Sequence, residues 1–367
     1  MSPGEPVRVL IAGGGTGGHL MPALAIASAL AEIGGVEPVM VGARRGVEAS
    51  LLPRRPFRFY LLPAEPLYRR AWWRNARWAL TAWPLAAQSR RVLRVERPAV
   101  VVGTGGYAAA PLLLGAWVSG IPMVLQEQNA FPGLTTRWFA RRARQVHLGF
   151  PEAERYLRPG PRTRVYALGN PITPPDPTLG REAARAKLGL KADAGVVFAF
   201  GGSQGARKIN TVVAQLLDAG RLDHLTLCWG TGEAAWEAYA RYHDPPRRLV
   251  RPFWDPIGEA YAAADLAVAR SGAMTTAELC AYGLPAILIP LPTAAADHQT
   301  RNAEALAAAG AAVHLPETSL TGDRLLEAID GLLSTPSRVS QMGARARARG
   351  QPEAARKIAE SVVALMR

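Results

Sequence analysis

The stretch GGGTGGHLMP, residues 13–22, follows the apolar run VRVLIA, residues 7–12, and precedes ALAIASAL, residues 23–30. A β-branched run, a glycine-rich segment and a second apolar run predict a strand, a tight turn and a helix that begins near Pro22. Glycines let a ligand approach the backbone, and the first N–H groups of a helix have no partner within it. The turn therefore suits a phosphate group.

The same turn matches a dinucleotide-binding fingerprint, because Gly13, Gly15 and Gly18 satisfy G-x-G-x-x-G. A dehydrogenase needs an acidic residue after its second strand to hold the ribose. Here that strand is followed by Ala-Arg-Arg at 43–45, which suits a 2′-phosphate at best. His19 favours a loop that meets a reacting hydroxyl, although a histidine near a helix start can equally have no chemical role, and both interpretations stay open.

Length and composition indicate a folded, two-domain, enzyme-like chain. It has 367 residues, of which 49% are hydrophobic, and this length exceeds a usual single core. The two cysteines, Cys228 and Cys280, lie in apolar segments and predict buried thiols rather than a disulfide framework. No metal-like cluster of histidines is visible, so we expect no metal. With no secretory signal and no apolar run of membrane-spanning length, we expect the protein in the cytoplasm or on the cytoplasmic side of a membrane.

The chain is strongly basic, with a net charge of +14, which predicts an anionic partner or surface. The charge is uneven. Residues 1–160 contain 20 arginines, no lysine and nine acidic residues, so that 11 of the 14 net positive charges lie in the first domain.

Apolar strand-like runs separated by helical segments predict two α/β domains with parallel sheets. A proline-rich run at 169–177 places the boundary, giving a first domain of residues 1–168 and a second of 169–350, and helix 351–367 is expected to pack back on the first. We expect two Rossmann-like, doubly wound domains facing a cleft at the carboxyl ends of their strands. The predicted strands are 7–12, 38–42, 57–62, 99–103, 122–126, 145–148, 164–168, 196–200, 225–230, 248–251, 265–269, 286–291 and 312–315.

Residues 68–94 form a basic, aromatic stretch with four tryptophans, several arginines and no acidic residue. Tryptophan favours the headgroup level of a bilayer and arginine is attracted to anionic lipid, so the stretch predicts an interfacial amphipathic helix. Nucleic-acid binding and a core helix with a solvated basic face are the alternatives. The residues expected at the membrane are Trp72, Trp73, Arg74, Arg77, Trp78 and Trp83.

Further polar turns follow other predicted strands. GTGGY at 103–107 is a second glycine turn, and two such turns side by side could hold a diphosphate between them. Glu127 and Asn129 end another strand and are candidates for hydroxyl contacts or proton transfer. In the second half, GGSQGA at 201–206 and RSGAMTTAE at 270–278 are strand-to-helix turns whose hydroxyls and N–H groups could hold a diphosphate, and Glu278 could accept both hydroxyls of a ribose.

Taken together, the motifs GGGTGGHLMP, GTGGYAAAP, LQEQNAFPG, GNP, GGSQGARKIN, RSGAMTTAELCAYGLP and DHQTRNA resemble, in this order, those of the MurG family of bacterial transferases. The resemblance covers nearly the whole chain. It implies a GT-B fold and transfer of N-acetylglucosamine from UDP-N-acetylglucosamine to undecaprenyl-linked muramoyl-pentapeptide in peptidoglycan synthesis. It further implies inversion, no metal or other cofactor, and a peripheral location on the inner membrane.

The resemblance also assigns residues. It implies acceptor contacts at Gly105, Gly106 and Tyr107, and a uracil contact through the backbone at Trp254. Thr173 stands where the family often has an arginine, so any phosphate contact of that arginine is replaced or missing. The implied donor contacts are Thr16, Gly17, Gly18, Asn129, Ser203, Trp254, Ala273, Met274, Thr275, Thr276, Ala277, Glu278 and Gln299.

Transfer needs a base to remove the proton of the acceptor hydroxyl, and His19 is the first candidate because its ordinary pKa is near neutrality. Glu127 is the second. Three other hypotheses stay open: a GT-B transferase that acts on diacylglycerol or sterol, an oxidoreductase that uses a nicotinamide cofactor, and a scaffold without enzymatic activity that binds RNA or membranes.

Overall fold

The computed structural model describes residues 6–66, 73, 77–202 and 205–366, with only the backbone described for 77–80. The chain divides into two compact units. Unit 1 comprises Met1–Thr173 and Glu353–Arg367, and unit 2 comprises Pro174–Pro352. The chain first passes from unit 1 to unit 2 between Thr173 and Pro174, inside the proline-rich run 169–177. Successive prolines there cannot continue a helix or a central strand.

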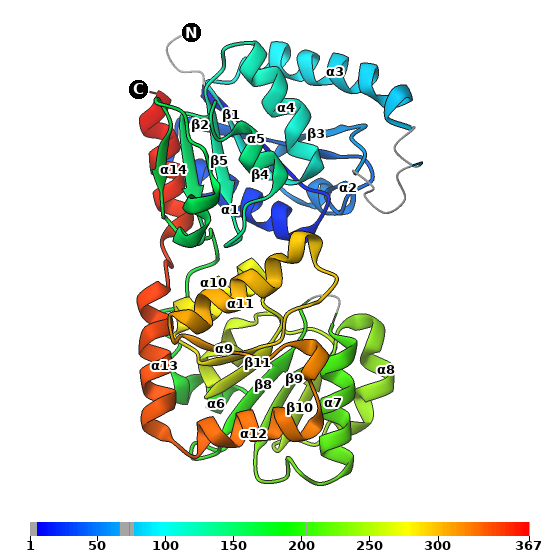
Figure 1. Cartoon of the computed structure of the whole chain (residues 1–367), viewed down its shortest axis with the longest axis vertical. Helices are drawn as coiled ribbons and strands as arrows, with labels where there is room; N and C mark the ends of the chain where they lie inside the picture. The colour runs from blue at the N-terminus through cyan, green and yellow to red at the C-terminus, as the bar shows by residue number, and fades with distance from the viewer. Residues whose placement is uncertain (1–5, 67–72, 74–76, 203–204, 367) are drawn as a thin grey trace. The chain divides into compact units, whose positions relative to one another are not determined.

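Unit 1 is a parallel seven-stranded sheet in the order β3-β2-β1-β4-β5-β6-β7 with helices on both faces (Figure 1). Its strands are β1 (Val7–Gly13), β2 (Val36–Ala43), β3 (Arg58–Leu62), β4 (Val100–Gly105), β5 (Met123–Glu127), β6 (Gln145–Leu148) and β7 (Arg164–Tyr166). Its helices are α1 (Gly17–Ile33), α2 (Glu48–Leu51), α3 (Arg77–Glu96), α4 (Gly106–Val118), α5 (Leu134–Phe139) and α14 (Ala354–Met366).

Unit 2 repeats the plan with a parallel six-stranded sheet in the order β10-β9-β8-β11-β12-β13. Its strands are β8 (Val196–Phe200), β9 (Thr226–Gly230), β10 (Arg248–Arg251), β11 (Leu266–Ala269), β12 (Ala286–Leu288) and β13 (Ala312–His314). Its helices are α6 (Arg181–Lys187), α7 (Arg207–Asp218), α8 (Trp236–Tyr239), α9 (Gly258–Ala263), α10 (Ala273–Tyr282), α11 (His298–Ala308), α12 (Gly322–Leu333) and α13 (Pro336–Arg349). The predicted α/β class is confirmed, and every predicted strand is present with ends shifted by a few residues at most.

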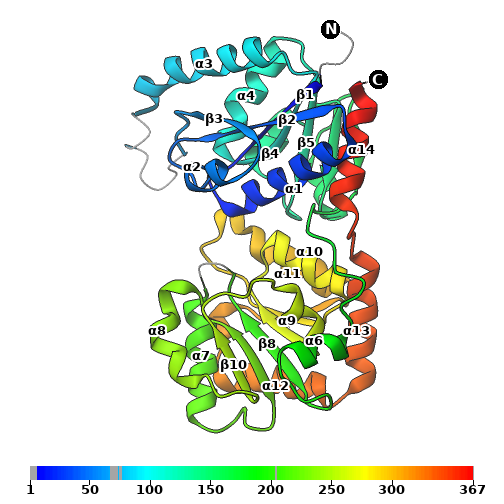
Figure 2. The ribbon, with the colours of Figure 1, turned by 180° about the vertical axis from the view of Figure 1, so that it is seen from behind.

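Alternate residues of β1 explain why its sheet is covered on both faces. Leu10 and Ala12 join the core beneath α3, α4 and α5, whereas Val9 and Ile11 join the core beneath α1 and α14. Successive side chains of a strand point to opposite faces, so an uninterrupted apolar run is what a doubly covered parallel strand requires. Figures 1 and 2 both show α14 alongside α1.

The start of the first helix differs from the prediction. Helix α1 begins at Gly17, so Pro22 lies inside it and not at its start. Pro22 is the sixth residue of α1, so the helix lacks the hydrogen bond that an N–H at this position would donate to the carbonyl oxygen of Gly18. As a consequence His19 is the third residue of the helix, not part of a loop that precedes it.

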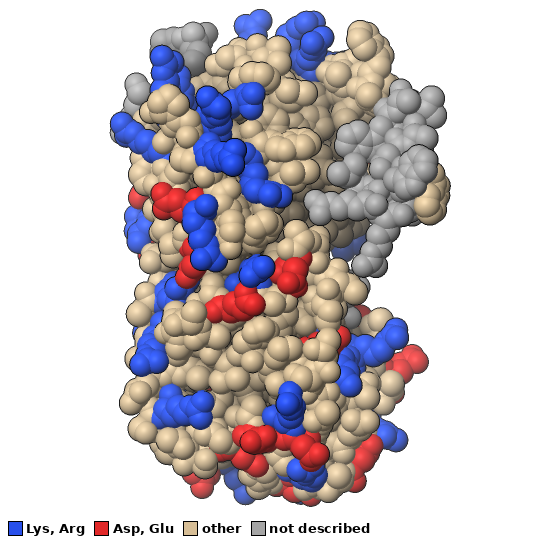
Figure 3. Space-filling model, viewed as in Figure 1, with Lys and Arg blue, Asp and Glu red and all other residues tan. Residues whose placement is uncertain are grey.

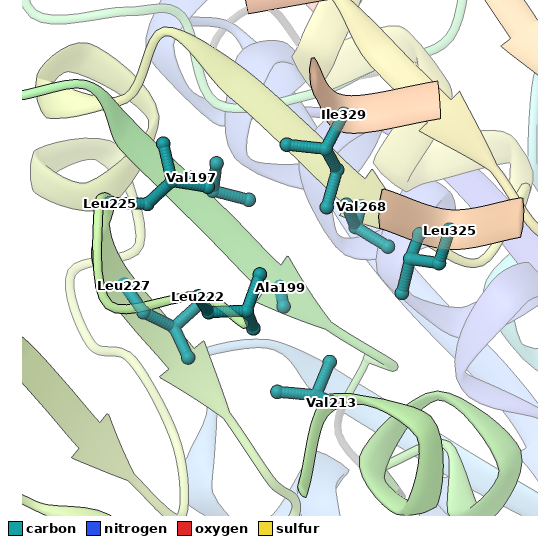
Figure 4. Close-up of a pocket in the computed structure, with 9 residues that line it drawn as sticks. All are labelled: Val197, Ala199, Val213, Leu222, Leu225, Leu227, Val268, Leu325 and Ile329. Atoms are coloured by element: carbon teal, nitrogen blue, oxygen red, sulfur yellow. The ribbon is translucent and has the colours of Figure 1, made fainter. Parts of the chain in front are cut away.

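Unit 2 has a small apolar cavity between its sheet and the helices α7 and α12 (Figure 4). Its volume is about 10 Å³, which corresponds to about one water molecule. An apolar space of this size is a packing defect and not a ligand site. It is lined by Val197, Ala199, Val213, Leu222, Leu225, Leu227, Val268, Leu325 and Ile329.

The strand orders fix where ligands approach. In unit 1 the chain runs from β1 outward to β3 and then returns to β4 on the other side of β1. In unit 2 the same reversal occurs between β8 and β11. Ligands of such sheets bind outside the carboxyl ends of the strands at the reversal. These are the strands that the glycine turns and the 270–278 turn follow.

Candidate active site

The two glycine turns of unit 1 lie side by side because β1 and β4 are neighbours in the sheet. A Cβ atom on Gly106 would lie 2.2 Å from the carbonyl oxygen of Gly14, and one on Gly13 would lie 1.8 Å from the Thr104 hydroxyl oxygen. Only glycine fits at such distances. The two turns are therefore packed closely against each other, and the expectation that they hold a diphosphate stays a prediction.

His19 faces the second turn, and its hydrogen bonds define its tautomer. Its Nδ1 lies 3.0 Å from the carbonyl oxygen of Thr104 and 3.0 Å from Oε1 of Gln128. The NH₂ group of Gln128 donates to the carbonyl oxygens of Thr104 and Gln126, which can only accept. Both atoms that face Nδ1 are then acceptors. Nδ1 therefore carries the proton, and Nε2 is the basic nitrogen of the neutral ring.

A buried amide network fixes Gln128 in turn. The Gln126 side chain donates to Oδ1 of Asn170 at 3.1 Å, and the Asn170 side chain donates to the Gln128 carbonyl oxygen at 2.9 Å. All three side chains are buried. Buried amides with satisfied partners are held in one orientation, so the network makes the partner of His19 rigid.

Glu127 is buried and its two oxygens are occupied. Oε1 accepts from the backbone N–H of Asn129 at 3.1 Å and from its side chain at 3.3 Å. Oε2 accepts from the N–H of Gly133 at 2.9 Å and from the Thr136 hydroxyl at 2.6 Å. The carboxylate thus closes the loop between β5 and α5. This arrangement favours a role in holding Asn129 and the loop over a role in proton removal.

Glu48 is a site residue that the sequence analysis missed. Its side chain is fully buried beneath the first glycine turn and accepts hydrogen bonds from the N–H groups of Gly15 and Ala43. Glu48 and Gly15 are 33 positions apart. The signal available in the sequence was an acidic residue soon after the second strand, where the dinucleotide fingerprint also requires one.

In unit 2 the turn after β11 leads into α10, whose first-turn N–H groups have no partner within the helix. The Ser271 hydroxyl donates to the backbone oxygen of Gln299 at 2.8 Å, and the Asn302 side chain donates to the backbone oxygen of Ser271 at 3.1 Å. These bonds fix the start of α11 beside the start of α10. Oε1 of Gln299 accepts from the N–H of Leu291 at 2.9 Å, so the NH₂ group is the part of its side chain left for a ligand.

Glu278 lies in α10 and is held by Tyr261, whose hydroxyl donates to Oε2 at 2.8 Å. Burial raises the pKa of the Glu278 carboxyl, and the Tyr261 hydrogen bond opposes that rise. Burial and the nearby Glu278 carboxylate raise the pKa of Tyr261 well above its usual value. The second oxygen of Glu278 has no hydrogen-bond donor among the residues that the structure describes, and it is a suitable acceptor for ribose hydroxyls.

The side chains of two residues predicted to contact the UDP-sugar point into the protein. The Thr276 hydroxyl lies 3.0 Å from the carbonyl oxygens of Gly272 and Ala273, and its backbone N–H bonds to Gly272. It is buried, so the expectation that this hydroxyl faces a diphosphate is wrong. The Trp254 indole is also buried, packed against Phe198 and under the Arg251 guanidinium, so that only its backbone can face a ligand.

The other predicted donor and acceptor residues occupy the expected turns. Thr16, Gly17 and Gly18 form the exposed start of α1. Gly105 precedes α4, and Tyr107, in its first turn, packs its ring over Gly15. Ala273, Met274, Thr275 and Ala277 lie in the first half of α10. Ser203 lies outside the described residues.

The predicted membrane residues are described only in part. Trp72 and Arg74 lie outside the described residues, and Arg77 and Trp78 are described as backbone of α3 only. The side chains of Trp73 and Trp83 are 63% and 78% exposed. Two further exposed tryptophans, Trp117 and Trp138, were not singled out from the sequence.

Two negative observations apply to the described part of the chain. None of its helices combines the length and the apolar character that crossing a bilayer would require. Nowhere in these ranges do three His, Cys, Asp or Glu side chains gather as metal ligands would.

Comparison with known proteins adds the family. Residues 9–148 match the glycosyltransferase family 28 N-terminal domain, and residues 196–362 match its C-terminal domain. A UDP-N-acetylglucosamine–N-acetylmuramyl-(pentapeptide) pyrophosphoryl-undecaprenol N-acetylglucosamine transferase of Chlorobaculum parvum is 42% identical over 98% of this chain and 99% of its own. The transferase of the same name from Desulforamulus reducens is 36% identical over 95% of this chain and 96% of its own.

Solved structures agree. The crystal structure of Acinetobacter baumannii MurG matches with a TM-score of 0.77 and 27% identity, covering 98% of this chain and 99% of that one. A glycosyltransferase of kitacinnamycin matches with a TM-score of 0.68 at 18% identity, which shows the shared fold alone. Two parallel-sheet α/β units with these matches fit the GT-B prediction. The chain belongs to glycosyltransferase family 28 and, within it, to the MurG family.

Proposed function

We propose that this protein transfers N-acetylglucosamine from UDP-N-acetylglucosamine to the 4-hydroxyl of undecaprenyl-pyrophosphoryl-muramoyl-pentapeptide, a step of peptidoglycan synthesis. The relatives that carry this activity in their names match over nearly the full chain. The observation that carries the chemistry is the fixed tautomer of His19, which leaves a basic nitrogen at the start of α1 beside the two glycine turns.

In this proposal unit 1 binds the acceptor and unit 2 binds most of the donor. Nε2 of His19 takes the proton of the 4-hydroxyl while the oxygen attacks the anomeric carbon. The bond from that carbon to the diphosphate oxygen breaks on the opposite face, so the configuration inverts and UDP leaves. The α10 N–H groups, with Thr275 beside them, stabilise the charge on the leaving diphosphate, and no metal is required.

The remaining residues bind the two substrates or position the residues that do. Glu278 accepts from the ribose, the backbone of Trp254 contacts the uracil, and the Gln299 amide donates to the sugar or the diphosphate. Gly105, Gly106 and Tyr107 form the acceptor side of unit 1. Glu127 is the alternative base, but its four hydrogen bonds support a role in holding Asn129 against the donor sugar.

The test is a transfer assay with radiolabelled UDP-N-acetylglucosamine and a lipid-linked muramoyl-pentapeptide. We expect label in the lipid product with this acceptor, and little label when diacylglycerol replaces it or UDP-glucose replaces the donor. Transfer to diacylglycerol at a comparable rate would instead assign the chain to lipid glycosylation. Quenching of protein fluorescence by NADPH with no effect of UDP-sugars would support the oxidoreductase hypothesis.

We further propose that unit 1 attaches to the cytoplasmic face of the membrane through α3 and the segment that precedes it. Trp73 and Trp83 are exposed although tryptophan is usually mostly buried. Lys and Arg side chains gather over the face of unit 1 in Figure 3, where acidic side chains are few, while unit 2 carries both signs. Arginine with exposed tryptophan suits an anionic lipid surface.

Vesicle co-sedimentation tests this attachment. The wild-type protein should sediment with anionic vesicles and much less with neutral ones, and the double variant Trp73→Ala/Trp83→Ala should sediment less. Trp236→Ala, in helix α8 of unit 2, is the control. Equal sedimentation with both kinds of vesicle would count against the proposal, and retention on single-stranded RNA in place of vesicles would favour nucleic-acid binding.

A further inference from the structure

The Glu48 side chain lies in a socket, by which we mean the buried space left by the missing side chains of Gly14, Gly42 and Gly46. A Cβ atom on Gly14 or on Gly46 would lie 2.2 Å from a Glu48 carboxylate oxygen, and one on Gly42 would lie 2.4 Å from Glu48 Cγ. The three glycines come from the first turn, from β2 and from the segment that follows β2. A side chain at any of them would displace the carboxylate, so the socket is specific for Glu48 in this position.

The partners of this carboxylate are unusual for a buried charge. Gly15 N–H donates to both oxygens, at 3.0 and 2.9 Å, and Ala43 N–H donates to Oε1 at 2.7 Å. Buried carboxylates are commonly paired with Arg or Lys. Among the residues that the structure describes, no ion pair joins Glu48 to a cation. The Glu48 carboxylate oxygens accept hydrogen bonds from backbone N–H groups at a glycine turn. The oxygens of a bound phosphate are held by such turns in the same way.

We propose that Glu48 is an internal anion that fills the first glycine turn and acts as a positioning residue for His19. By holding the N–H of Gly15, it fixes the residue directly before the Thr16 cap of α1, and so the direction in which the helix presents His19. The turn's N–H at Gly15 is then unavailable to the acceptor diphosphate. The outer side of the turn faces the neutral sugar ring and its 4-hydroxyl. This inference rests on the proposed acceptor role of unit 1.

Chemical rescue tests the internal anion. Glu48→Ala leaves a carboxylate-sized space that is lined by two N–H donors. We expect kcat to fall on the order of a hundredfold, because a small misplacement of a catalytic group has effects of this size. Added sodium formate should restore kcat about tenfold, while sodium chloride at the same ionic strength should not. UDP affinity should stay unchanged, since the nucleotide is proposed to bind unit 2.

Glu48→Gln keeps the proposal testable if the alanine variant does not fold. Its amide retains one acceptor but points NH₂ at one of the two N–H groups, so kcat should fall about tenfold in a folded protein without a formate effect. Glu96→Gln is the matched control. Glu96 is also buried in unit 1, but it pairs with Arg8, Arg58 and Tyr60 near the amino ends of the strands, away from the turns.

The outcomes separate this inference from the proposed function. A wild-type protein that fails to transfer sugar to the lipid-linked muramoyl-pentapeptide defeats the proposed function. An active wild type with folded Glu48→Gln at unchanged kcat, or with folded Glu48→Ala that is inactive and insensitive to formate, overturns the inference alone. A Glu96→Gln variant with the same loss of kcat as Glu48→Gln would also overturn it, because the effect would then be general destabilisation of unit 1.

Discussion

In each unit a turn follows one of the strands at which the strand order reverses, and the two turns differ in the charge of the side chain buried beneath them. In unit 1 the first turn wraps a buried carboxylate, Glu48, and presents a histidine. In unit 2 the turn after β11 starts at Arg270, which is buried. Arg270 donates to the carbonyl oxygens of Ile289 and Pro290 and pairs with Glu317, and the turn leads into the first N–H groups of α10. We therefore propose that a turn at the carboxyl ends of the strands serves proton removal in unit 1 and anion binding in unit 2. The two turns differ in the charged residue that lies beneath them, Glu48 in unit 1 and Arg270 in unit 2.

The largest expected effect concerns unit 1, which we propose holds the catalytic base. His19→Ala removes Nε2, and we expect kcat to fall on the order of a hundredfold or more with UDP affinity nearly intact. Steady-state kinetics and calorimetric titration with UDP measure the two quantities. If the variant keeps most of its turnover, the base is elsewhere, and Glu127→Gln is the next variant to measure.

Acidification should lower the folding stability of unit 1 in particular, because His147 in β6 is buried there. Burial lowers the pKa of this histidine from 6.5 to about 4, so the unfolded chain binds a proton below pH 6.5 that the folded chain does not. Stability is then lost as the pH falls from 6.5 towards 4, by about 2 kcal/mol at pH 5.

Urea unfolding at pH 7.5 and pH 5 measures this loss, which His147→Phe should reduce. His224→Gln, an exposed histidine of unit 2, is the control. Unit 1 should melt first at pH 5. An unchanged pH dependence in His147→Phe would show that other groups control the acid sensitivity.

A smaller effect is expected at the donor side of unit 2. Glu278→Gln replaces a charged acceptor with a neutral one, and KM for UDP-N-acetylglucosamine should rise about tenfold with little change in kcat. Because the pKa of Glu278 is raised, donor binding should weaken on acidification at a higher pH than for an ordinary carboxyl, and Glu278→Gln should abolish that dependence. An unaltered KM would remove Glu278 from the donor site.

The smallest effect is expected from Tyr261→Phe, which removes one hydrogen bond that orients Glu278. KM for the donor should rise about threefold at unchanged kcat, in line with a single neutral donor. Tyr282→Phe is the control, because Tyr282 contacts the Tyr261 ring without bonding to Glu278 in any described contact. Equal effects of both variants would indicate a change in packing.

Much of this organisation could be predicted from local sequence. Continuous apolar runs located the strands, and glycines that follow these runs located the turns. What the sequence could not supply were contacts between distant residues. The socket of Glu48 joins three glycines from separate segments, and the saturation of Glu127 depends on Thr136 and Gly133 in a loop without periodicity. The start of α1 was predicted too late because Pro22 was taken as a boundary, whereas it is the sixth residue of the helix.

The path of α14 has a consequence for biosynthesis. This last helix contributes Ile358, Ala359 and Val362 to the core beneath α1, so unit 1 is assembled from both ends of the chain. During translation, all of unit 2 is synthesised before the final piece of unit 1 is made. A shortened gene ending after unit 2 would therefore encode a complete second unit attached to a first unit that lacks part of its interior.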